Sequence, residues 1–301
     1  MYEDFYKFLG RPFSPAADPS CYFLSLQHAE ALAVAQYSLL TNAGLTVITG
    51  ESGLGKTLLM RRVSSNLDDS IVLGTIEHTH TDFRNILPWV ISAFELRSRM
   101  SDPVEMHEVL IQFLKEQAQS DRRVVLVIDE AQNLSQSALE EVRLLMNLSS
   151  NDKHGLQFVL LGQPRFREML KQASMSELAQ RVAIDFELYP FDYESTDDYI
   201  TYRLSIQGGL PELFPYTTRA SIYYHSKGIP RLINSICDLA LVYGFGESSE
   251  IIDLKIIKRV IQSQKVSLGI YERLELTPDA SGLRTAIHAS HGVDIGNFGM
   301  L

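Results

Sequence analysis

The stretch Leu45–Thr57, LTVITGESGLGKT, constrains the fold of this chain more than any other part of the sequence. A short apolar run leads into a glycine-rich turn that ends in lysine and threonine, with the spacing G-x-x-x-x-G-K-[ST] of a phosphate-binding loop. Glycine lets backbone N–H groups curl closely around a phosphate, and the helix that follows directs its positive end at the same anion. The pattern therefore predicts a nucleotide site after a buried parallel strand, in preference to a glycine-rich turn with an incidental lysine.

Each position of this loop is a candidate contact to the nucleotide. The set comprises Gly50, Glu51, Ser52, Gly53, Leu54, Gly55, Lys56, Thr57 and Leu58. We expect the ammonium of Lys56 to reach the β- and γ-phosphates and the hydroxyl of Thr57 to hold Mg²⁺. Leu54 stands at a position where the backbone makes the contact, so its side chain is not expected to matter for binding.

Acidic and amide side chains follow two other predicted strands. Val124–Glu130 (VVLVIDE) reads as a buried strand that ends in two carboxylates, and Gln157–Leu161 is followed by Gly162-Gln163. We expect Asp129 to hold Mg²⁺ and Glu130 to orient the attacking water, while Gln163 senses the γ-phosphate or helps to hold that water. A solvated turn is the alternative for the acidic pair, and the phosphate loop in the same chain disfavours it.

The order of predicted elements indicates an α/β fold. Apolar runs at 45–49, 71–76, 124–130, 157–161 and 182–188 read as strands, the last an edge strand, and helical patterns lie between them. Such alternation predicts a parallel sheet covered on both faces, a P-loop three-layer domain. From about Tyr193 the strands stop, and Ser195–Ile206, Thr217–Tyr224, Pro230–Tyr243 and Asp253–Gln264 read as a small all-α bundle. We therefore expect a lead-in at 1–43, an ATPase core at 44–191, a helical lid at 192–268 and a flexible tail at 269–301.

The lead-in carries an aromatic segment and a helix. Its aromatic residues are spaced to pack a small lobe; they are Tyr2, Phe5, Tyr6, Phe8 and Phe13. Residues 27–40 lack helix breakers and read as a helix that His28 opens. His28 is interpreted either as a capping or packing histidine or as a neighbour of the nucleotide base, and the pattern alone leaves both open.

The bulk composition limits the environment and the partners. The chain has 301 residues, 45% of them hydrophobic, and a net charge of −10, which argues mildly against tight non-specific DNA binding. Its apolar runs are far shorter than the ~20 residues of a membrane span, and its first 20 residues lack the apolar core of a secretory signal. Cys21 and Cys237 lie far apart, which is typical of two reduced, buried thiols. These features predict a cytoplasmic location with no membrane span in the chain itself.

With these elements placed, the chain resembles the AAA+ ATPases, and among them the general secretion pathway protein A (ExeA-type) ATPases. The resemblance rests on motifs in order over residues 1–265: PF…DP…HAEAL (12–32), GESGLGKT, VIDEAQNL (127–134), LEEVRLLMNL (139–148), LLGQP (160–164), LAQR (178–181) and GIPRLIN (228–234). It implies ATP and Mg²⁺ as ligands and hydrolysis as the reaction. It also implies that Arg181 is an arginine finger acting on the ATP of a neighbouring subunit, and that Arg231 is a sensor-2 arginine that joins the helical lid to the γ-phosphate. The alternatives are an ion-paired surface arginine for Arg181 and a contact at the start of a helix for Arg231.

The resemblance further implies a homo-oligomer that works as a switch or motor in assembling an envelope, secretion or polysaccharide-export apparatus. Full ExeA-type proteins continue into a transmembrane helix and a periplasmic region, and this sequence contains neither. We therefore expect a protein partner at the inner membrane, to which this chain would be peripheral. A DNA-associated ATPase, similar to transposition regulators or origin initiators, is the alternative, and an ATP-binding scaffold that hardly hydrolyses is a third interpretation.

Overall fold

The computed structural model describes residues 1–14, 21–41, 43–77, 85–97, 102–148 and 155–268. The predicted tail at 269–301 lies outside these ranges. The chain divides into two compact units, one formed by Leu24–Tyr189 and one by Met1–Phe23 together with the chain from Pro190 onwards. The expected lead-in at 1–43 is thus shared between the two units, which are described separately below.

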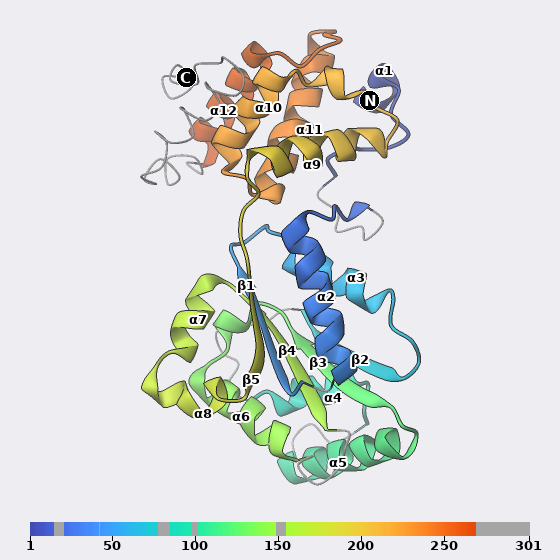
Figure 1. Cartoon of the computed structure of the whole chain (residues 1–301), viewed down its shortest axis with the longest axis vertical. Coiled ribbons are helices and arrows are strands. Elements are labelled where there is room, and N and C mark those ends of the chain that lie inside the picture. Colours follow the sequence, from blue (N-terminus) through green and yellow to red (C-terminus); the bar gives the residue numbers. More distant parts are fainter. Residues whose placement is uncertain (15–20, 42, 78–84, 98–101, 149–154, 269–301) are drawn as a thin grey trace. The chain divides into compact units, whose positions relative to one another are not determined.

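The unit Leu24–Tyr189 is built on a parallel sheet (Figure 1). Within the described residues, the sheet has five strands in the order β2-β3-β4-β1-β5. Their bounds are β1 (Leu45–Gly50), β2 (Ile71–Ile76), β3 (Arg123–Ile128), β4 (Leu156–Gly162) and β5 (Val182–Leu188). β5 lies at one edge, as its alternating apolar and acidic residues predicted.

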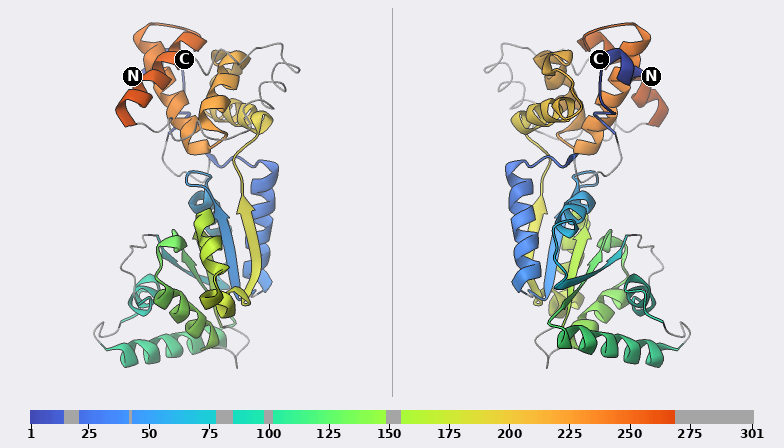
Figure 2. Two further views of the ribbon diagram at one scale, coloured as in Figure 1. Left: turned by 90° about the vertical axis from the view of Figure 1, so that its left-hand side faces the viewer. Right: turned by 90° about the vertical axis from the view of Figure 1, so that its right-hand side faces the viewer.

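Helices cover both faces of this sheet (Figures 1 and 2). One face carries α2 (Leu26–Thr41) and α3 (Lys56–Ser64). The other carries α4 (Leu87–Ala93), α5 (Pro103–Gln119), α6 (Gln136–Asn147), α7 (Pro164–Leu170) and α8 (Ser176–Ala179), with the short 3-10 turns η2 (Ala131–Asn133) and η3 (Ala173–Met175). The predicted three-layer α/β fold is therefore confirmed.

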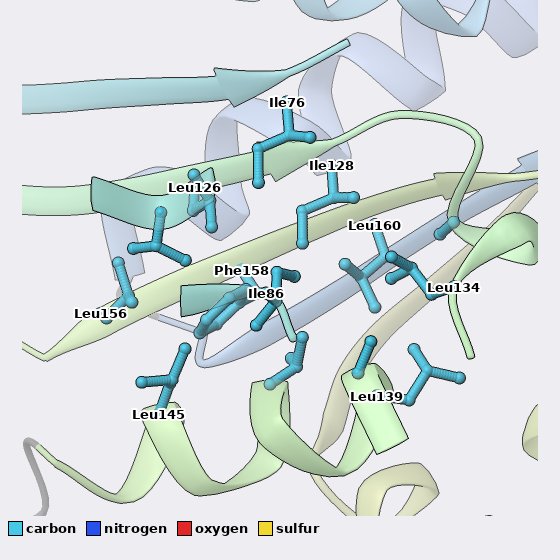
Figure 3. Close-up of a cluster of buried hydrophobic side chains, with 14 of the residues drawn as sticks. Ile76, Ile86, Leu126, Ile128, Leu134, Leu139, Leu145, Leu156, Phe158 and Leu160 are labelled. Carbon is cyan, nitrogen blue, oxygen red and sulfur yellow. The ribbon is translucent and has the colours of Figure 1, made fainter. Parts of the chain in front are cut away.

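The strand sequences explain why the sheet is buried on both faces. Alternate residues of β3 and β4 point to α4, α5 and α6, where they form a hydrophobic cluster (Figure 3). Leu126 and Phe158 are register partners in this cluster, and Leu139 and Leu145 of α6 pack against the same face. The intervening Val127 and Val159 face the opposite side and are also buried. β3 and β4 are apolar at almost every position, as is typical of interior strands in such a sheet.

Polar contacts fix α2 on its face of the sheet. The hydroxyl of Thr46 on β1 donates to the hydroxyl of Ser38 at 2.7 Å, and the side-chain amide of Gln157 on β4 donates to the Ser38 carbonyl at 2.8 Å. At the C-terminal end of α2, Nη1 of Arg123 donates to the carbonyl of Leu40 at 2.7 Å. A cation at this position also complements the helix dipole. α2 is thus hydrogen-bonded to β1, to β4 and to the first residue of β3.

The second unit is helical in its described part. It contains α1 (Tyr2–Tyr6), α9 (Tyr193–Ser205), η4 (Pro211–Leu213), α10 (Tyr216–Ser226), α11 (Pro230–Gly246) and α12 (Leu254–Leu268). Tyr2, Phe8 and Phe13 are buried in one core with α9, α10, α11 and α12, and the Tyr2 hydroxyl bonds to the Asp238 carboxylate of α11. These three rings, which the sequence assigns to a small lobe, thus form part of the core of the helical unit.

Hydrogen bonds to backbone carbonyls stabilise this unit at two places. The buried guanidinium of Arg203 on α9 donates to the carbonyl of Pro12 at 2.6 Å and to that of Ser14 at 3.3 Å. The N–H of Phe191 donates to the carbonyl of Gly228 at 2.9 Å. Gly228 has a φ of +73°, and a Cβ there would lie 1.9 Å from the Phe191 carbonyl oxygen. Only glycine allows the two segments to come this close. Gly228 lies just before α11.

Two observations bear on the expected environment. Cys237 is buried in the helical core, whereas Cys21 is only partly buried, so the prediction that both thiols are buried is wrong for Cys21. Across the residues that the structure describes, each helix is too short or too polar to cross a lipid bilayer.

Candidate nucleotide site

The site follows from the strand order. In a parallel sheet the C-terminal ends of all strands lie at one edge, where loops carry ligand-binding residues. β3, β4 and β1 are consecutive neighbours in the sheet. The loops after them carry, respectively, Asp129 with Glu130, Gln163, and the phosphate loop. The three predicted groups of site residues are therefore adjacent.

The phosphate loop has the backbone that its glycines predict. Gly53 and Gly55 have φ values of +90° and +96°, in the left-handed region that favours glycine. At Gly50 a Cβ would lie 2.7 Å from the carbonyl oxygen of Leu188, so the close passage of β5 requires glycine there. Leu54 is fully buried, whereas Glu51 and Ser52 are exposed. Leu54 thus anchors the loop to the unit while its neighbours face outward.

Lys56 is held within the loop that precedes it. Its side chain is buried, and Nζ donates to the carbonyl of Gly50 at 2.7 Å and to that of Glu51 at 3.0 Å. Lys56 is also the first residue of α3, with Gly55 at the N-cap position. A charged ammonium and a helix N-terminus therefore converge on one short loop, which is the arrangement that binds a phosphate group.

Thr57 and Asp129 come together from α3 and the end of β3. The Thr57 hydroxyl donates to Oδ2 of Asp129, while Oδ1 accepts from the backbone N–H of Glu130 at 2.8 Å. Burial raises the pKa of Asp129, and the hydrogen bonds from Thr57 and Glu130 oppose that shift. A hydroxyl beside a carboxylate is an oxygen donor set that fits Mg²⁺, which usually takes few protein ligands and completes its shell with phosphates and water.

Glu130 and Gln163 belong to one hydrogen-bonded network. The side-chain amide of Gln163 donates to Oε2 of Glu130 at 3.2 Å. Gln132, in η2, donates to the same Oε2, and its Oε1 accepts from the backbone N–H of Gln163 at 2.8 Å. Glu130 itself has a φ of +54°, a left-handed conformation that is uncommon for a non-glycine residue. The network holds the carboxylate of Glu130 between two amides at the edge of the sheet.

Gln132 was missed as a site residue by the sequence analysis. It lies in the motif VIDEAQNL, but a glutamine two residues after an acidic pair carries no spacing signal of its own. The amide of Gln132 reaches both Glu130 and Gln163 only because Gln132 lies in the turn η2.

His28 contacts the phosphate loop directly. Its Nε2 lies 3.0 Å from the carbonyl oxygen of Leu54, and its Nδ1 lies 2.7 Å from the hydroxyl of Ser25. The ring is buried, and burial lowers the pKa of His28. His28 is therefore a buried histidine that bonds to the loop backbone.

The two candidate arginines lie elsewhere. Arg181 is exposed just before β5, and its Nη2 donates to Oδ1 of Asn147 at 2.9 Å. In the register of β1 and β5, Val182 pairs with Leu45 and Leu188 pairs with Gly50. Arg181 thus stands about 20 Å from the phosphate loop of its own chain, at the opposite end of the strand. Arg231 is the second residue of α11 and belongs to the helical unit.

Comparisons with known proteins identify the family of the chain. A family profile described as AAA domain matches residues 39–170, which include the loop, Asp129, Glu130 and Gln163. General secretion pathway protein A of Aeromonas hydrophila is 33% identical to this chain over 250 residues, which cover 83% of the chain. The chain belongs to the AAA+ ATPases. The predicted resemblance to that ATPase family is confirmed. The chain spans about half the length of this curated relative, 46%.

Solved AAA+ structures share the fold at low sequence identity. The ORC2 protein of Aeropyrum pernix, in its ADPNP–ADP complexes, matches with a TM-score of 0.63 and 12% identity, covering 94% of this chain and 85% of that one. A chain of Drosophila ORC bound to DNA matches with a TM-score of 0.66 and 13% identity, and the match covers 99% of this chain and 73% of that one. The Walker-type ATPase PABY2304 of Pyrococcus abyssi matches with a TM-score of 0.56 and 17% identity, and the match covers 94% of this chain and 89% of that one. At these identities the likeness concerns the fold alone.

Proposed function

We propose that this AAA+ ATPase binds ATP with Mg²⁺ at the candidate nucleotide site and hydrolyses it. The observation that carries the proposal is the adjacency of three loops, in which Thr57 bonds to Asp129 and Glu130 bonds to Gln163. An isolated glycine-rich turn would have no reason to lie beside such residues.

Each side chain has a part in this proposal. The loop amides and Lys56 bind the phosphates, and Thr57 and Asp129 hold the metal ion. When bound, Mg²⁺ neutralises charge on the phosphate oxygens. Glu130 accepts a hydrogen bond from the attacking water and so orients it toward the γ-phosphate. Gln163 lies within reach of Glu130 and is suited to report on that phosphate.

We propose that the complete site forms between two copies of the chain. Arg181 lies at the far end of β5 from its own phosphate loop, so it is suited to act on nucleotide bound by a neighbour. An arginine supplied in trans contributes about 10³–10⁵ in rate where it has been measured in other NTPases. The role of Arg231, through which the helical domain of residues 192–268 would sense nucleotide as a lid, is part of the same proposal.

The proposed biological role is assembly of an envelope, secretion or polysaccharide-export apparatus by an oligomeric switch at the inner membrane. It rests on the likeness to general secretion pathway protein A. The work would be done through a protein partner, with this chain on the cytoplasmic side. The net charge of −10 supports a protein target over DNA, which is the alternative.

The experiment is ATP hydrolysis by two variants, alone and mixed. Glu130→Gln should bind ATP but not hydrolyse it, and Arg181→Ala should lose hydrolysis because it gives its neighbour no arginine. A mixture of the two should regain activity, since an Arg181→Ala subunit beside a Glu130→Gln subunit has an intact Glu130 and receives an intact Arg181. About a quarter of head-to-tail interfaces in a random equal mixture are of this kind.

Two controls make the result decisive. Lys56→Ala should abolish ATP binding, and a mixture of Lys56→Ala with Glu130→Gln should stay inactive, because neither subunit has a complete nucleotide site whichever arginine it receives. If Glu130→Gln hydrolyses ATP at the wild-type rate, the role of Glu130 is wrong. If the mixture stays inactive while both variants still assemble, action of Arg181 in trans is wrong. Salt-sensitive, ATP-dependent binding to duplex DNA would favour the DNA-associated alternative.

A further inference from the structure

The contact between His28 and the phosphate loop fixes the tautomer of the ring. The carbonyl oxygen of Leu54, 3.0 Å from Nε2, can only accept a hydrogen bond, so Nε2 carries the proton. Nδ1 then accepts from the hydroxyl of Ser25 at 2.7 Å, which is free to rotate toward it. Both ring nitrogens therefore have a defined partner in the neutral form.

The same contact sets the orientation of a peptide group in the loop. In a trans peptide the carbonyl oxygen and the following N–H point in opposite directions across a rigid plane. Because the Leu54 oxygen is directed at His28 on α2, the N–H of Gly55 is directed away from α2. Gly55 is the N-cap of α3 and the glycine next to Lys56, so its N–H is one of the first donors at that helix N-terminus.

Gly55 leaves the orientation of the preceding peptide open, although its own carbonyl accepts from the N–H of Leu59 at 2.8 Å. Its φ of +96° is accessible to glycine together with many other conformations, so nothing in its own chemistry selects one peptide orientation. The ring of His28 lies beneath it, with Nε2 3.8 Å from the position of a Gly55 Cβ. The hydrogen bond to Leu54 and this packing together restrict the glycine.

α2 provides a fixed base for the ring. Gln27, the residue before His28, makes two hydrogen bonds to the backbone of Tyr189: Nε2 donates to its carbonyl at 2.7 Å, and Oε1 accepts from its N–H at 3.0 Å. Further along, Ser38 is bonded to β1 and β4, as described above. His28 thus stands on a helix that is anchored near its start and in its second half.

We propose that His28 is a positioning residue for phosphate binding, holding the Leu54–Gly55 peptide so that the Gly55 N–H is presented to the bound phosphate. The inference rests on the proposed ATP-binding function and adds a residue that the loop motif does not contain. A buried histidine that only fills space makes a different prediction, because its replacement would then act through size and not through the position of a donor.

The test compares three substitutions at one position. In His28→Gln the side-chain N–H₂ reaches about as far as Nε2 and retains a donor for Leu54, whereas in His28→Asn the amide reaches only the position of Nδ1. His28→Met is the control for size, because its side chain is about as large as that of glutamine but carries no donor. Affinity for a fluorescent ATP analogue and steady-state hydrolysis are measured for all three. We expect His28→Asn and His28→Met to weaken binding about tenfold, chiefly through KM, and His28→Gln to stay within about threefold of wild type.

Two further measurements separate this role from folding and from the proposed function. The ring tautomer in the wild-type protein is read from ¹⁵N chemical shifts, and we expect the proton on Nε2. A proton on Nδ1, or equal affinities of the Gln and Met variants, would overturn the inference. Lys56→Ala is measured alongside: if wild type and Lys56→Ala bind the analogue equally, the proposed function itself fails, whereas a loss in Lys56→Ala with equal Gln and Met variants refutes only the role of His28.

Discussion

Substituting Gly228 by alanine should destabilise the helical unit strongly. The new Cβ would meet the Phe191 carbonyl oxygen at 1.9 Å, and real Cβ atoms essentially never come within 3.0 Å of such an atom. The chain segments at Phe191 and Gly228 must therefore move apart. The left-handed φ of +73° adds a penalty of about 1–2 kcal/mol for any residue with a Cβ.

The separation also breaks a hydrogen bond. The N–H of Phe191 donates to the Gly228 carbonyl at 2.9 Å, and both residues are buried. Leaving buried partners unsatisfied costs about 1–3 kcal/mol. The two terms together give a loss of about 2–5 kcal/mol, a large part of the ~5–15 kcal/mol by which a typical domain is stable.

The assay uses two spectroscopic signals that report on different parts of the chain. The sequence contains a single tryptophan, Trp89 on α4 of the sheet unit, so its fluorescence follows that unit, while far-UV circular dichroism follows both. In urea, Gly228→Ala should move the dichroism transition to lower concentration and leave the Trp89 transition less affected. Gly246→Ala is the matched control, because a Cβ at the end of α11 would meet nothing within 4 Å. Equal midpoints for the two variants would refute the reasoning.

Three further outcomes are expected. Gln132→Leu should lower kcat about tenfold or more with little change in KM, because Glu130 loses the amide that holds it; steady-state kinetics at saturating ATP will test this. Arg203→Met should cost about 1–3 kcal/mol by leaving buried backbone carbonyls without a donor, measured as a lower midpoint in the dichroism transition. Burial lowers the pKa of His28 in the folded state, so its contribution to stability is complete above the ordinary pKa of about 6.5 and is lost as the pH falls through the lowered value. His28→Gln should therefore lose less unfolding free energy than wild type between pH 7.5 and 5.5, and parallel profiles would contradict this.

The sheet and the loop motif could be predicted because their signals are local. Buried parallel strands are apolar at almost every position, and the predicted strand at 71–76 coincides with β2 while the one at 182–188 coincides with β5. The glycine spacing of the loop depends on backbone geometry within eight residues. The helical region from Tyr193 was likewise readable from its periodicity, with ends that differ from the predicted ones by a few residues.

Features that depend on distant residues could not be predicted. The strand order β2-β3-β4-β1-β5 is set by how helices of similar pattern pack on the sheet, which no single segment encodes. Short α7 and α8 carry too few turns to give a periodic signal. Nothing near Tyr2 in sequence indicates Asp238 as its partner. For the same reason the sequence does not decide between the two roles of His28, neither of which includes a bond to the Leu54 carbonyl.

The division of the helical unit between the two ends of the described chain bears on how the protein is made. On the ribosome, Met1–Phe23 emerges before the helices that enclose Tyr2, Phe8 and Phe13, which begin only after Pro190. The sheet unit is continuous in sequence and can form while these aromatic rings are still exposed to water. Folding of the helical unit then follows that of the sheet unit, and a chaperone that shields Met1–Phe23 during that interval would raise the yield of native protein.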